Sequence, residues 1–414
     1  MIRILPISAS ADLLRNRGAR LEEAESTVRP ILEDVERRGD AALHEYARRF
    51  DNFSGTSFAA NQEDLSHATD RVTPEFRASI LTASGNIRAF ARHQLPTTHT
   101  SEIAPGIIAG QIVIPLNTAV AYIPAGRYPL PSTLMMTVIP AQVAGVPRIV
   151  VASPKPVMAI YGVASMLGVS DVFQMGGAHA IAAFAFGTRT VPKVDRIVGP
   201  GNIYVAAAKK LLAGEVGIDF VAGPSEILII AQDGDPRVVA ADMLAQAEHD
   251  VEASAILLTS SKSLAKAVAA EVARQLESLP TAPVAAQAIS KNSAIILVRS
   301  TDEALELANQ FAPEHLSIPE SSLLHQIRHA GSVFVGPFSP EAAGDYASGP
   351  NHVLPTGGAA RQRGGLSAAD FVKVISVQEL NAEALAALAP AISTLARAEG
   401  LEAHARSVEV RTNG

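Results

Sequence analysis

The sequence predicts an α/β protein built on two parallel β-sheets. From residue 118 onward, short aliphatic runs alternate with helical segments, the pattern of parallel strands joined by helical crossovers. Hydrophobic residues make up 48% of the 414 residues and aromatic residues only 5%. This aliphatic composition suits strands that are buried on both faces, and the length is sufficient for two or more domains.

The predicted elements follow one another in a regular order. The first hundred residues are expected to be mainly helical, with a break near Gly39 and a new helix after Thr73 and Pro74, an N-cap followed by proline. Strand-like segments are expected at 110–116, 118–126, 148–153, 171–177, 195–201, 220–231, 254–260, 293–300 and 331–338. Helices are expected at 156–168, 178–187, 202–213, 236–249, 262–278, 302–311 and from residue 381 onward.

Composition excludes several classes of function. The net charge is −7 and no basic stretch occurs, so nucleic acid is not an expected partner. No uninterrupted apolar segment is long enough to span a membrane, and the N-terminus lacks a signal-peptide pattern, so a cytoplasmic location is predicted. Cysteine is absent, which excludes thiol catalysis and leaves His, Asp, Glu, Asn and Gln as the only metal ligands.

The run EAAGDYASGPNHVLPTG at 341–357 is the most informative stretch of the chain. It contains Asp345 and His352 among glycines and prolines, whose density predicts a loop rather than a helix or strand. Long irregular loops that carry a carboxylate, an imidazole and an amide are typical of functional sites. The sequence therefore predicts a site at this loop.

Two further pairs of side chains could carry chemistry. Gln246 and His249 lie three positions apart at the end of the predicted helix 236–249, so both project from one side of its last turn. A capped core histidine is the alternative reading. Glu314 and His315 are adjacent, and an acid beside an imidazole can divide proton-transfer roles. A surface pair at a helix end is the alternative there.

Other patterns are weaker. His325 and His329 in HQIRH have helical spacing but lack the glutamate of a metalloprotease motif, so they are interpreted as a partly exposed helix face. The glycine turns at 176–179 and 199–202 could present backbone N–H groups to a phosphate, but they also suit ordinary strand-to-helix turns. Neither matches the dinucleotide fingerprint.

The C-terminal Glu399 and His404 lie five positions apart, and a histidine near a chain end is normally solvated.

Taken together, these motifs resemble the histidinol dehydrogenase family. The resemblance covers nearly the whole chain, through the ordered stretches GPGNIYVAAAKKLL, AGPSEILIIA, AQAEH, APEHL, AGDYASGPNHVLPTG, GGLSAADFVKVISVQEL and EGLEAH. It implies two Rossmann-like parallel-sheet domains, a helical N-terminal segment and a C-terminal helical tail exchanged in a homodimer. The domains implied are 1–20 as an N-terminal segment, 21–120 with 225–366 as the metal and catalytic domain, 121–224 as the NAD domain, and 367–414 as the dimerisation tail.

The resemblance also implies an activity and a set of site residues. The activity is oxidation of L-histidinol to L-histidine through an aldehyde, with zinc and two molecules of NAD. By position, the zinc ligands are Gln246, His249, Asp345 and His404. His315 matches the catalytic base and Glu314 the residue that activates water. The substrate contacts are Ser225, Gln246, His249, His315, Asp345, His352, Glu399 and His404, of which Glu399 and His404 would come from the other subunit. The NAD contacts are Tyr122, His179 and Asn202.

Two departures from the family pattern lie near the expected cofactor contacts. His179 stands where glutamine is usual, and Ala125 replaces a common glycine in a loop that is one residue shorter. One alternative function is therefore a related zinc and NAD dehydrogenase that acts on another small alcohol, such as a sulfonated diol. A zinc hydrolase and a catalytically inactive binding protein are alternatives from other classes.

Overall fold

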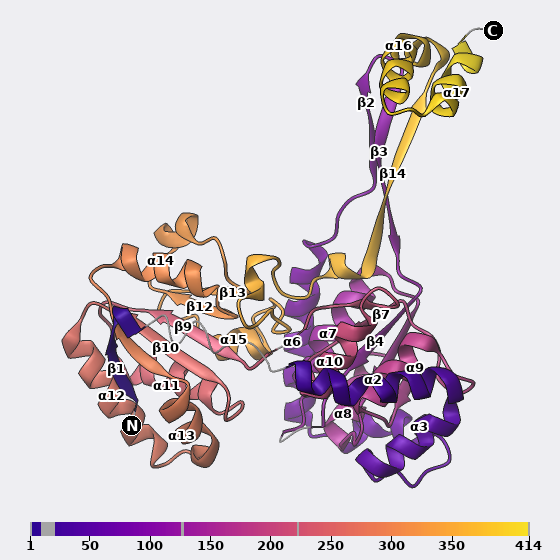
Figure 1. Ribbon diagram of the computed structural model, residues 1–414. Helices are drawn as coiled ribbons and strands as arrows, with labels where there is room; N and C mark the ends of the chain where they lie inside the picture. The colour runs from indigo at the N-terminus through magenta and orange to yellow at the C-terminus, as the bar shows by residue number, and fades with distance from the viewer. Residues whose placement is uncertain (1, 10–20, 126–127, 222, 413–414) are drawn as a thin grey trace.

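The protein has two lobes and a long arm. We describe it from a computed structural model, which covers residues 2–9, 21–125, 128–221 and 223–412. Figure 1 shows one lobe around β9, β10 and β12, a second lobe around β4 and β7, and an arm of β2, β3 and β14 that carries α16 and α17 at its tip. Residues 10–20 of the expected N-terminal segment lie outside the described residues.

The first lobe contains a six-stranded parallel sheet in the order β1-β11-β10-β9-β12-β13. Its strands are β1 (Arg3–Pro6), β9 (Glu226–Ile230), β10 (Ser254–Thr259), β11 (Ala294–Leu297), β12 (His315–Ile318) and β13 (Ser332–Val335). One face packs against α11 (Pro236–Ala247), α12 (Lys262–Leu276) and α13 (Ala282–Lys291), and the other against α14 (Thr301–Phe311). The inner strands β9, β10, β11 and β12 are buried on both faces, as their aliphatic sequences predict, and the edge strands β1 and β13 are more exposed.

The second lobe contains a five-stranded parallel sheet in the order β6-β5-β4-β7-β8. Its strands are β4 (Thr118–Tyr122), β5 (Arg148–Ala152), β6 (Asp171–Phe173), β7 (Arg196–Val198) and β8 (Gly217–Ile218). The crossover helices are α7 (Pro131–Ala144), α8 (Met158–Met166), α9 (Gly177–Phe186) and α10 (Ile203–Leu212). In both lobes the strand order reverses beside the first strand of the unit, the arrangement of doubly wound nucleotide-binding folds.

The N-terminal helices pack on the second lobe. The helices are α2 (Leu21–Arg38), α3 (Asp40–Tyr46), α4 (Gln62–Ser66), α5 (Ala68–Arg71) and α6 (Pro74–Arg92). Val28 and Leu32 of α2 join the core of α9 and α10, and Ile80 and Ile87 of α6 join that of α7. α2 and α6 thus pack on helices that cover the five-stranded sheet, and the expected division, which groups 21–120 with 225–366, stays a prediction.

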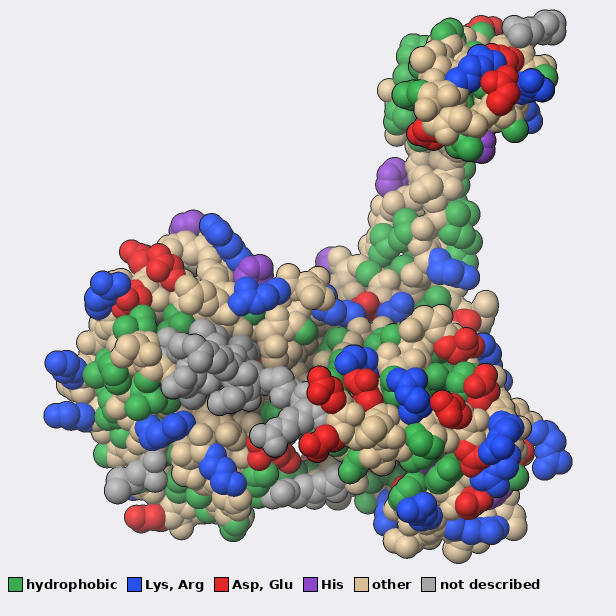
Figure 2. All heavy atoms as spheres, viewed as in Figure 1, with side chains coloured by type: hydrophobic (Ala, Val, Ile, Leu, Met, Phe, Trp, Pro, Cys, Tyr) green, Lys and Arg blue, Asp and Glu red, His purple; other side chains and the backbone are tan. Residues whose placement is uncertain are grey.

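The arm is a three-stranded antiparallel sheet. β3 (Ile107–Pro115) pairs with β2 (His99–Ala104) on one side and with β14 (Val372–Leu380) on the other. The segment after β14 forms α16 (Ala382–Ala398) and α17 (Glu402–Thr412), which confirms the expected C-terminal helices. Figure 2 shows hydrophobic side chains along the stalk of the arm, and Ile103 and Val374 are 66% and 51% exposed.

Local signals in the sequence account for many element boundaries. Gly39 separates α2 from α3, and the Thr73 side chain accepts from the backbone N–H of Phe76 at 3.2 Å to cap α6. The HQIRH motif is not one helix face, because a short 3₁₀ helix ends at Gln326 and leaves His329 beyond it. Among the described residues, none of the helices has the length and apolar character needed to cross a membrane.

Candidate active site

A buried acid and imidazole lie at the amino edge of the six-stranded sheet. Glu314 immediately precedes β12, and His315 is its first residue, with exposures of 6% and 4%. The backbone N–H of Glu226, the first residue of β9, donates to Glu314 Oε2 at 2.8 Å. His315 Nδ1 donates to the Glu226 carbonyl oxygen at 3.2 Å, and this oxygen can only accept. The pairing of β9 and β12 therefore sets the orientation of both side chains.

This bond leaves the second nitrogen of His315 available. Within the described residues His315 Nε2 is buried and has no hydrogen-bond partner, although it lies 3.7 Å from Asp345 Oδ1. A buried polar atom without a partner is costly in a folded protein and is frequently functional. In the neutral imidazole with Nδ1 protonated, Nε2 has a lone pair that can accept a proton. Nε2 is therefore a candidate proton acceptor.

Asp345 brings the two histidines together. It lies on α15 (Glu341–Tyr346), and its Oδ2 is 3.6 Å from His249 Nε2, just beyond the end of α11. Burial would raise the pKa of Asp345, but His249 and His315 outweigh burial and lower it. The prediction of a loop throughout 341–357 is wrong for its first six residues. Gly344 permits the short helix to lie against Phe334, whose ring a Cβ atom would approach to 2.6 Å.

Glu341 is a site residue that the sequence analysis missed. It is 3% exposed, and in one amide orientation Gln246 Nε2 donates to Glu341 Oε1 at 2.7 Å and to Oε2 at 3.1 Å, with His315 Nδ1 also 3.1 Å from this nitrogen. Glu341 Oε1 is also 3.9 Å from His315 Nδ1. Gln246 is fully buried, so its amide is held in one orientation. A glutamate in the opening turn of a helix resembles an ordinary helix start, so the sequence carried no signal for this role.

The carboxyl groups around His315 alter its protonation. Burial alone would lower the pKa of His315, but the carboxylates of Glu341, Glu314 and Asp345 raise it to about 10. Burial raises the pKa of Glu314 to about 8 and that of Glu341 to about 7. The carboxylates therefore favour the protonated imidazole of His315, while the pKa values of Glu314 and Glu341 lie near neutral pH.

The remainder of the 341–357 segment joins the two lobes. His352 Nδ1 donates to the carbonyl oxygen of Asp345 at 2.7 Å, and its Nε2 lies 3.2 Å from Thr133 Oγ1 on α7. Asn351 donates from its side chain to the Met136 carbonyl oxygen at 2.6 Å. His352 therefore lies one step from Asp345 but against the second lobe. Ser225 directly precedes Glu226 at the same edge of the six-stranded sheet as His315.

The predicted cofactor contacts lie at the carboxyl edge of the five-stranded sheet. Tyr122 ends β4 and is 3% exposed, and its hydroxyl accepts from the Gly177 N–H at 3.1 Å. The Asn202 side chain caps α10 by accepting from the N–H groups of Tyr204 and Val205, at 3.1 Å each. Tyr122 and Asn202 flank the point where the strand order reverses, the usual crevice for a nucleotide in such sheets.

His179 is buried in the same region. It is 1% exposed, and its Nε2 lies 3.1 Å from Asp51 Oδ2. The same Asp51 oxygen accepts from the Gly176 N–H at 3.2 Å. The start of α9 is therefore occupied by a carboxylate of the chain itself. In the other glycine turn, the Gly199 N–H also donates to a carboxylate, Asp219 Oδ2, at 2.8 Å, whereas the N-cap of α10 is the Asn202 side chain.

Two predicted site residues lie apart from the others. Glu399 directly follows α16 and His404 lies on α17; both are exposed, and these helices form the tip of the arm (Figure 1). Within one chain the arm does not bring them to Asp345, and the described residues contain no group of three His, Asp or Glu side chains positioned to hold a metal ion. The 3.6 Å between His249 Nε2 and Asp345 Oδ2 nevertheless suits neighbouring zinc ligands, which lie about 3.3 Å apart in a tetrahedral site.

The chain was compared with known proteins. A family model for histidinol dehydrogenase matches residues 14–412. Histidinol dehydrogenases of Geobacillus kaustophilus and Geobacter metallireducens are 45% and 46% identical to it, over 99% and 95% of this chain and 99% and 92% of theirs. The crystal structure of the enzyme from Elizabethkingia anophelis has a TM-score of 0.95 at 36% identity, covering 100% of this chain and 98% of that one.

The doubly wound sheets and the buried acid–imidazole pair, together with these matches, define an NAD-dependent oxidoreductase. The chain belongs to the histidinol dehydrogenase family, as its motifs predicted.

Glu341→Gln should lower the pKa of His315. The substitution removes a carboxylate that stabilises the imidazolium, so the neutral form should persist to lower pH. The measurement is an NMR titration of the metal-free protein with carbon-13 in its histidine rings. The matched control is Glu320→Gln, an exposed glutamate of the same lobe. An unchanged His315 titration in the Glu341 variant would contradict the arrangement described.

Proposed function

We propose that the protein catalyses the zinc-dependent oxidation of L-histidinol to L-histidine through histidinaldehyde, with reduction of two NAD. The observation that carries this proposal is the position of Asp345, 3.6 Å from His249 and 3.7 Å from the unpartnered nitrogen of His315. Asp345 would thus bind zinc together with His249 and lie beside His315, the proposed base. Membership of the histidinol dehydrogenase family supplies the reaction class.

The zinc ligands in this proposal are Gln246, His249 and Asp345 of one chain and His404 of a second copy. All four offer nitrogen or oxygen donors, which zinc accepts. Bound zinc would hold the imidazole and amine of histidinol, and its charge would favour the neutral form of His315. Glu341 holds the Gln246 amide nitrogen, which leaves the amide oxygen to face the ion.

His315 and Glu314 divide the proton transfers. His315 Nε2 accepts the hydroxyl proton of histidinol as the carbinol carbon is oxidised, and NAD when bound takes one hydride in each of the two rounds. The Glu314 carboxylate then accepts a proton from the water that adds to the aldehyde. His315 accepts the hydroxyl proton of the resulting hydrate in the second oxidation. Both side chains are almost fully buried, which excludes competing solvent.

The remaining contacts orient the two ligands. Ser225 and His352 would contact the substrate from either side of Asp345, and Glu399 would reach it together with His404 from a second copy. Tyr122, His179 and Asn202 would contact NAD at the carboxyl edge of the five-stranded sheet. NAD would thus be held at the carboxyl edge of the five-stranded sheet, and the substrate at the amino edge of the six-stranded sheet, where His315 begins β12.

The proposed assembly is a homodimer with shared sites. The stalk of the arm exposes apolar side chains, with Ile103 at 66% and Val374 at 51%, and a second copy would cover them. The same exchange would carry the exposed Glu399 and His404 to the other body. A cytoplasmic location remains a prediction from the sequence.

The function is tested by the ratio of products. Zinc-loaded protein given L-histidinol and NAD should form two NADH per histidine, since each of the two oxidations transfers one hydride. The comparison substrate is a sulfonated diol such as 2,3-dihydroxypropane-1-sulfonate. Turnover of the diol without turnover of histidinol would replace the proposed substrate by that of the related dehydrogenase. The departures at His179 and Ala125 make this comparison necessary.

Substitutions should separate the metal ligands from the base. His249→Asn should weaken zinc binding by more than about a hundredfold, because direct ligands contribute more than the residues around them. His315→Ala should keep its zinc and lose turnover by about a thousandfold or more, the contribution of a general base. Zinc content by atomic absorption and kcat are the two measurements. Loss of zinc in the His315 variant would reverse the assigned roles.

Mixed dimers should recover activity if the arms are exchanged. His315→Ala removes the base from the body, and His404→Ala removes the ligand from the arm, so each homodimer should be inactive. A hybrid has one intact site, formed by the body of the His404 variant and the arm of the His315 variant. Co-expression in equal amounts should restore roughly a quarter of wild-type activity, since half of the dimers have one site of two. No recovery would show that each site is built from one chain.

A further inference from the structure

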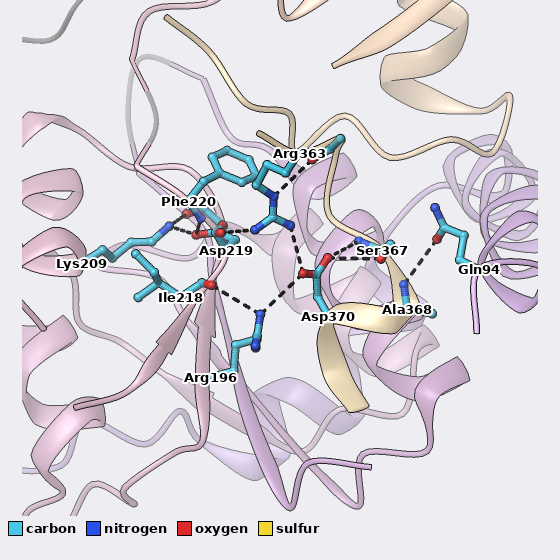
Figure 3. Close-up of polar contacts among 12 residues, drawn as sticks. Gln94, Arg196, Lys209, Ile218, Asp219, Phe220, Arg363, Ser367, Ala368 and Asp370 are labelled. Atoms are coloured by element: carbon cyan, nitrogen blue, oxygen red, sulfur yellow. Dashed lines mark hydrogen bonds and ion pairs between the residues drawn. The ribbon is translucent and has the colours of Figure 1, made fainter. Parts of the chain in front are cut away.

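A buried ion pair lies behind the turn that follows β7. Lys209 on α10 and Asp219, just after β8, are 2% and 4% exposed, and their charged groups are in contact (Figure 3). Neither is among the residues assigned to zinc, substrate or NAD above. Most long charged side chains remain at the surface, so a fully enclosed pair requires a reason.

Both charged groups bind the backbone of one glycine. Lys209 Nζ donates to the carbonyl oxygen of Gly199 at 3.0 Å, and Asp219 Oδ2 accepts from its N–H at 2.8 Å. Asp219 Oδ1 also accepts from the Phe220 N–H at 2.7 Å. Apart from their contact with each other, Lys209 and Asp219 thus form hydrogen bonds to backbone groups. The N–H and the carbonyl oxygen of Gly199 each have a charged partner.

Gly199 has little freedom to move in any direction. Its φ of +115° belongs to the region that favours glycine, and a Cβ atom there would lie 2.2 Å from the carbonyl oxygen of Tyr122. The turn is thus pressed against the end of β4 on one side and held by Lys209 and Asp219 on the other. Asn202, which begins α10, is three residues further along the same turn.

Asp219 is also tied to the base of the arm. Its carbonyl oxygen accepts from Arg363, whose other nitrogen donates to Asp370 Oδ1 at 2.9 Å (Figure 3). Asp370 lies 3.6 Å from Arg196 on β7 and accepts from the Ser367 N–H at 2.8 Å, just before β14 begins. The polar network therefore runs from the Gly199 turn to the strand that leads into the arm.

Stability alone does not explain the buried pair. Removing two charges from water costs about as much as their attraction returns, and apolar replacements of similar volume are often neutral or stabilising. Because the pair forms hydrogen bonds to both backbone groups of Gly199, its role is geometric: it holds this turn in one conformation. That turn lies where the strand order of the five-stranded sheet reverses, between β4 and β7.

We propose that Lys209 and Asp219 are positioning residues that hold the Gly199–Asn202 turn in the geometry required for NAD. The inference rests on the proposed function, because it takes the carboxyl edge of the five-stranded sheet as the cofactor site. Neither residue touches the cofactor. They fix the backbone against which it binds, so their loss should affect the nucleotide and not the alcohol.

The test compares neutral replacements at the two positions. Lys209→Met alone leaves Asp219 buried without a partner, which can prevent folding. The decisive variant is therefore the double replacement Lys209→Met with Asp219→Asn, which buries no net charge. The matched control is Lys210→Met, which removes the same charge one position along α10, where Lys210 pairs with the partly exposed Glu25 at 2.6 Å.

Three quantities are measured on the zinc-loaded enzyme: the Kd for NADH from its fluorescence, and the KM values for NAD and histidinol. In the double variant the Kd and the KM for NAD should rise by about tenfold or more, the effect of losing one well-made hydrogen bond to a positioned group. The KM for histidinol and the zinc content should stay unchanged. Lys210→Met should match the wild type in every quantity.

Each outcome decides the question. A folded double variant with wild-type affinity for NADH overturns the positioning role, and so does an equal rise in both KM values. A double variant that cannot fold also overturns it, because the pair would then serve stability. The wild-type titration is a separate readout, since wild-type protein that binds no NADH would overturn the proposed function itself.

Discussion

The carboxylate of Asp345 is the charge on which the arrangement of the site depends. It stays ionised although it is buried, because His249 and His315 lie on either side of it and lower its pKa. Removing it would leave two imidazoles facing each other beside Glu314 and Glu341. Two contacts position Asp345 on the short helix α15. Gly344 packs against the Phe334 ring, and His352 donates to the carbonyl oxygen of Asp345. Asp345 therefore links α15 to His249 at the end of α11 and to His315 at the start of β12.

The predicted cofactor contacts and the acid–imidazole pair lie at opposite kinds of sheet edge. Tyr122 and Gly199 lie at the carboxyl edge of the five-stranded sheet, where a doubly wound fold usually binds its ligand. Glu226 and His315 instead begin their strands, so the six-stranded sheet presents its amino edge. The contact between His352 and Thr133 links the segment that follows Asp345 to α7 of the second lobe.

Local sequence signals predicted most of the regular elements but not their long-range partners. The N-cap at Thr73 and the alternating aliphatic runs depend on neighbouring residues, and both expectations agree with the structure. β14 pairs with β3 across more than half of the chain, a contact that no short pattern encodes. The sequence could predict that Gln246 and His249 lie together, because both belong to one helix end. It could not predict the contact of Glu341 with Gln246, because this contact forms only when α15 packs beside α11.

The network around Asp219 joins two parts of the molecule that the proposed mechanism requires at the same time. Arg363 and Asp370 fix the start of β14, and β14 leads to the helices that carry Glu399 and His404. Lys209 and Asp219 fix the turn at Gly199. One polar network, in which Lys209 and Asp219 are buried and Arg363 and Asp370 are partly exposed, therefore holds both the base of the arm and the Gly199 turn. In the proposed dimer, the arm carries His404 to the site of the second copy. The same polar network would then fix both the direction of the arm and the turn proposed to bind NAD.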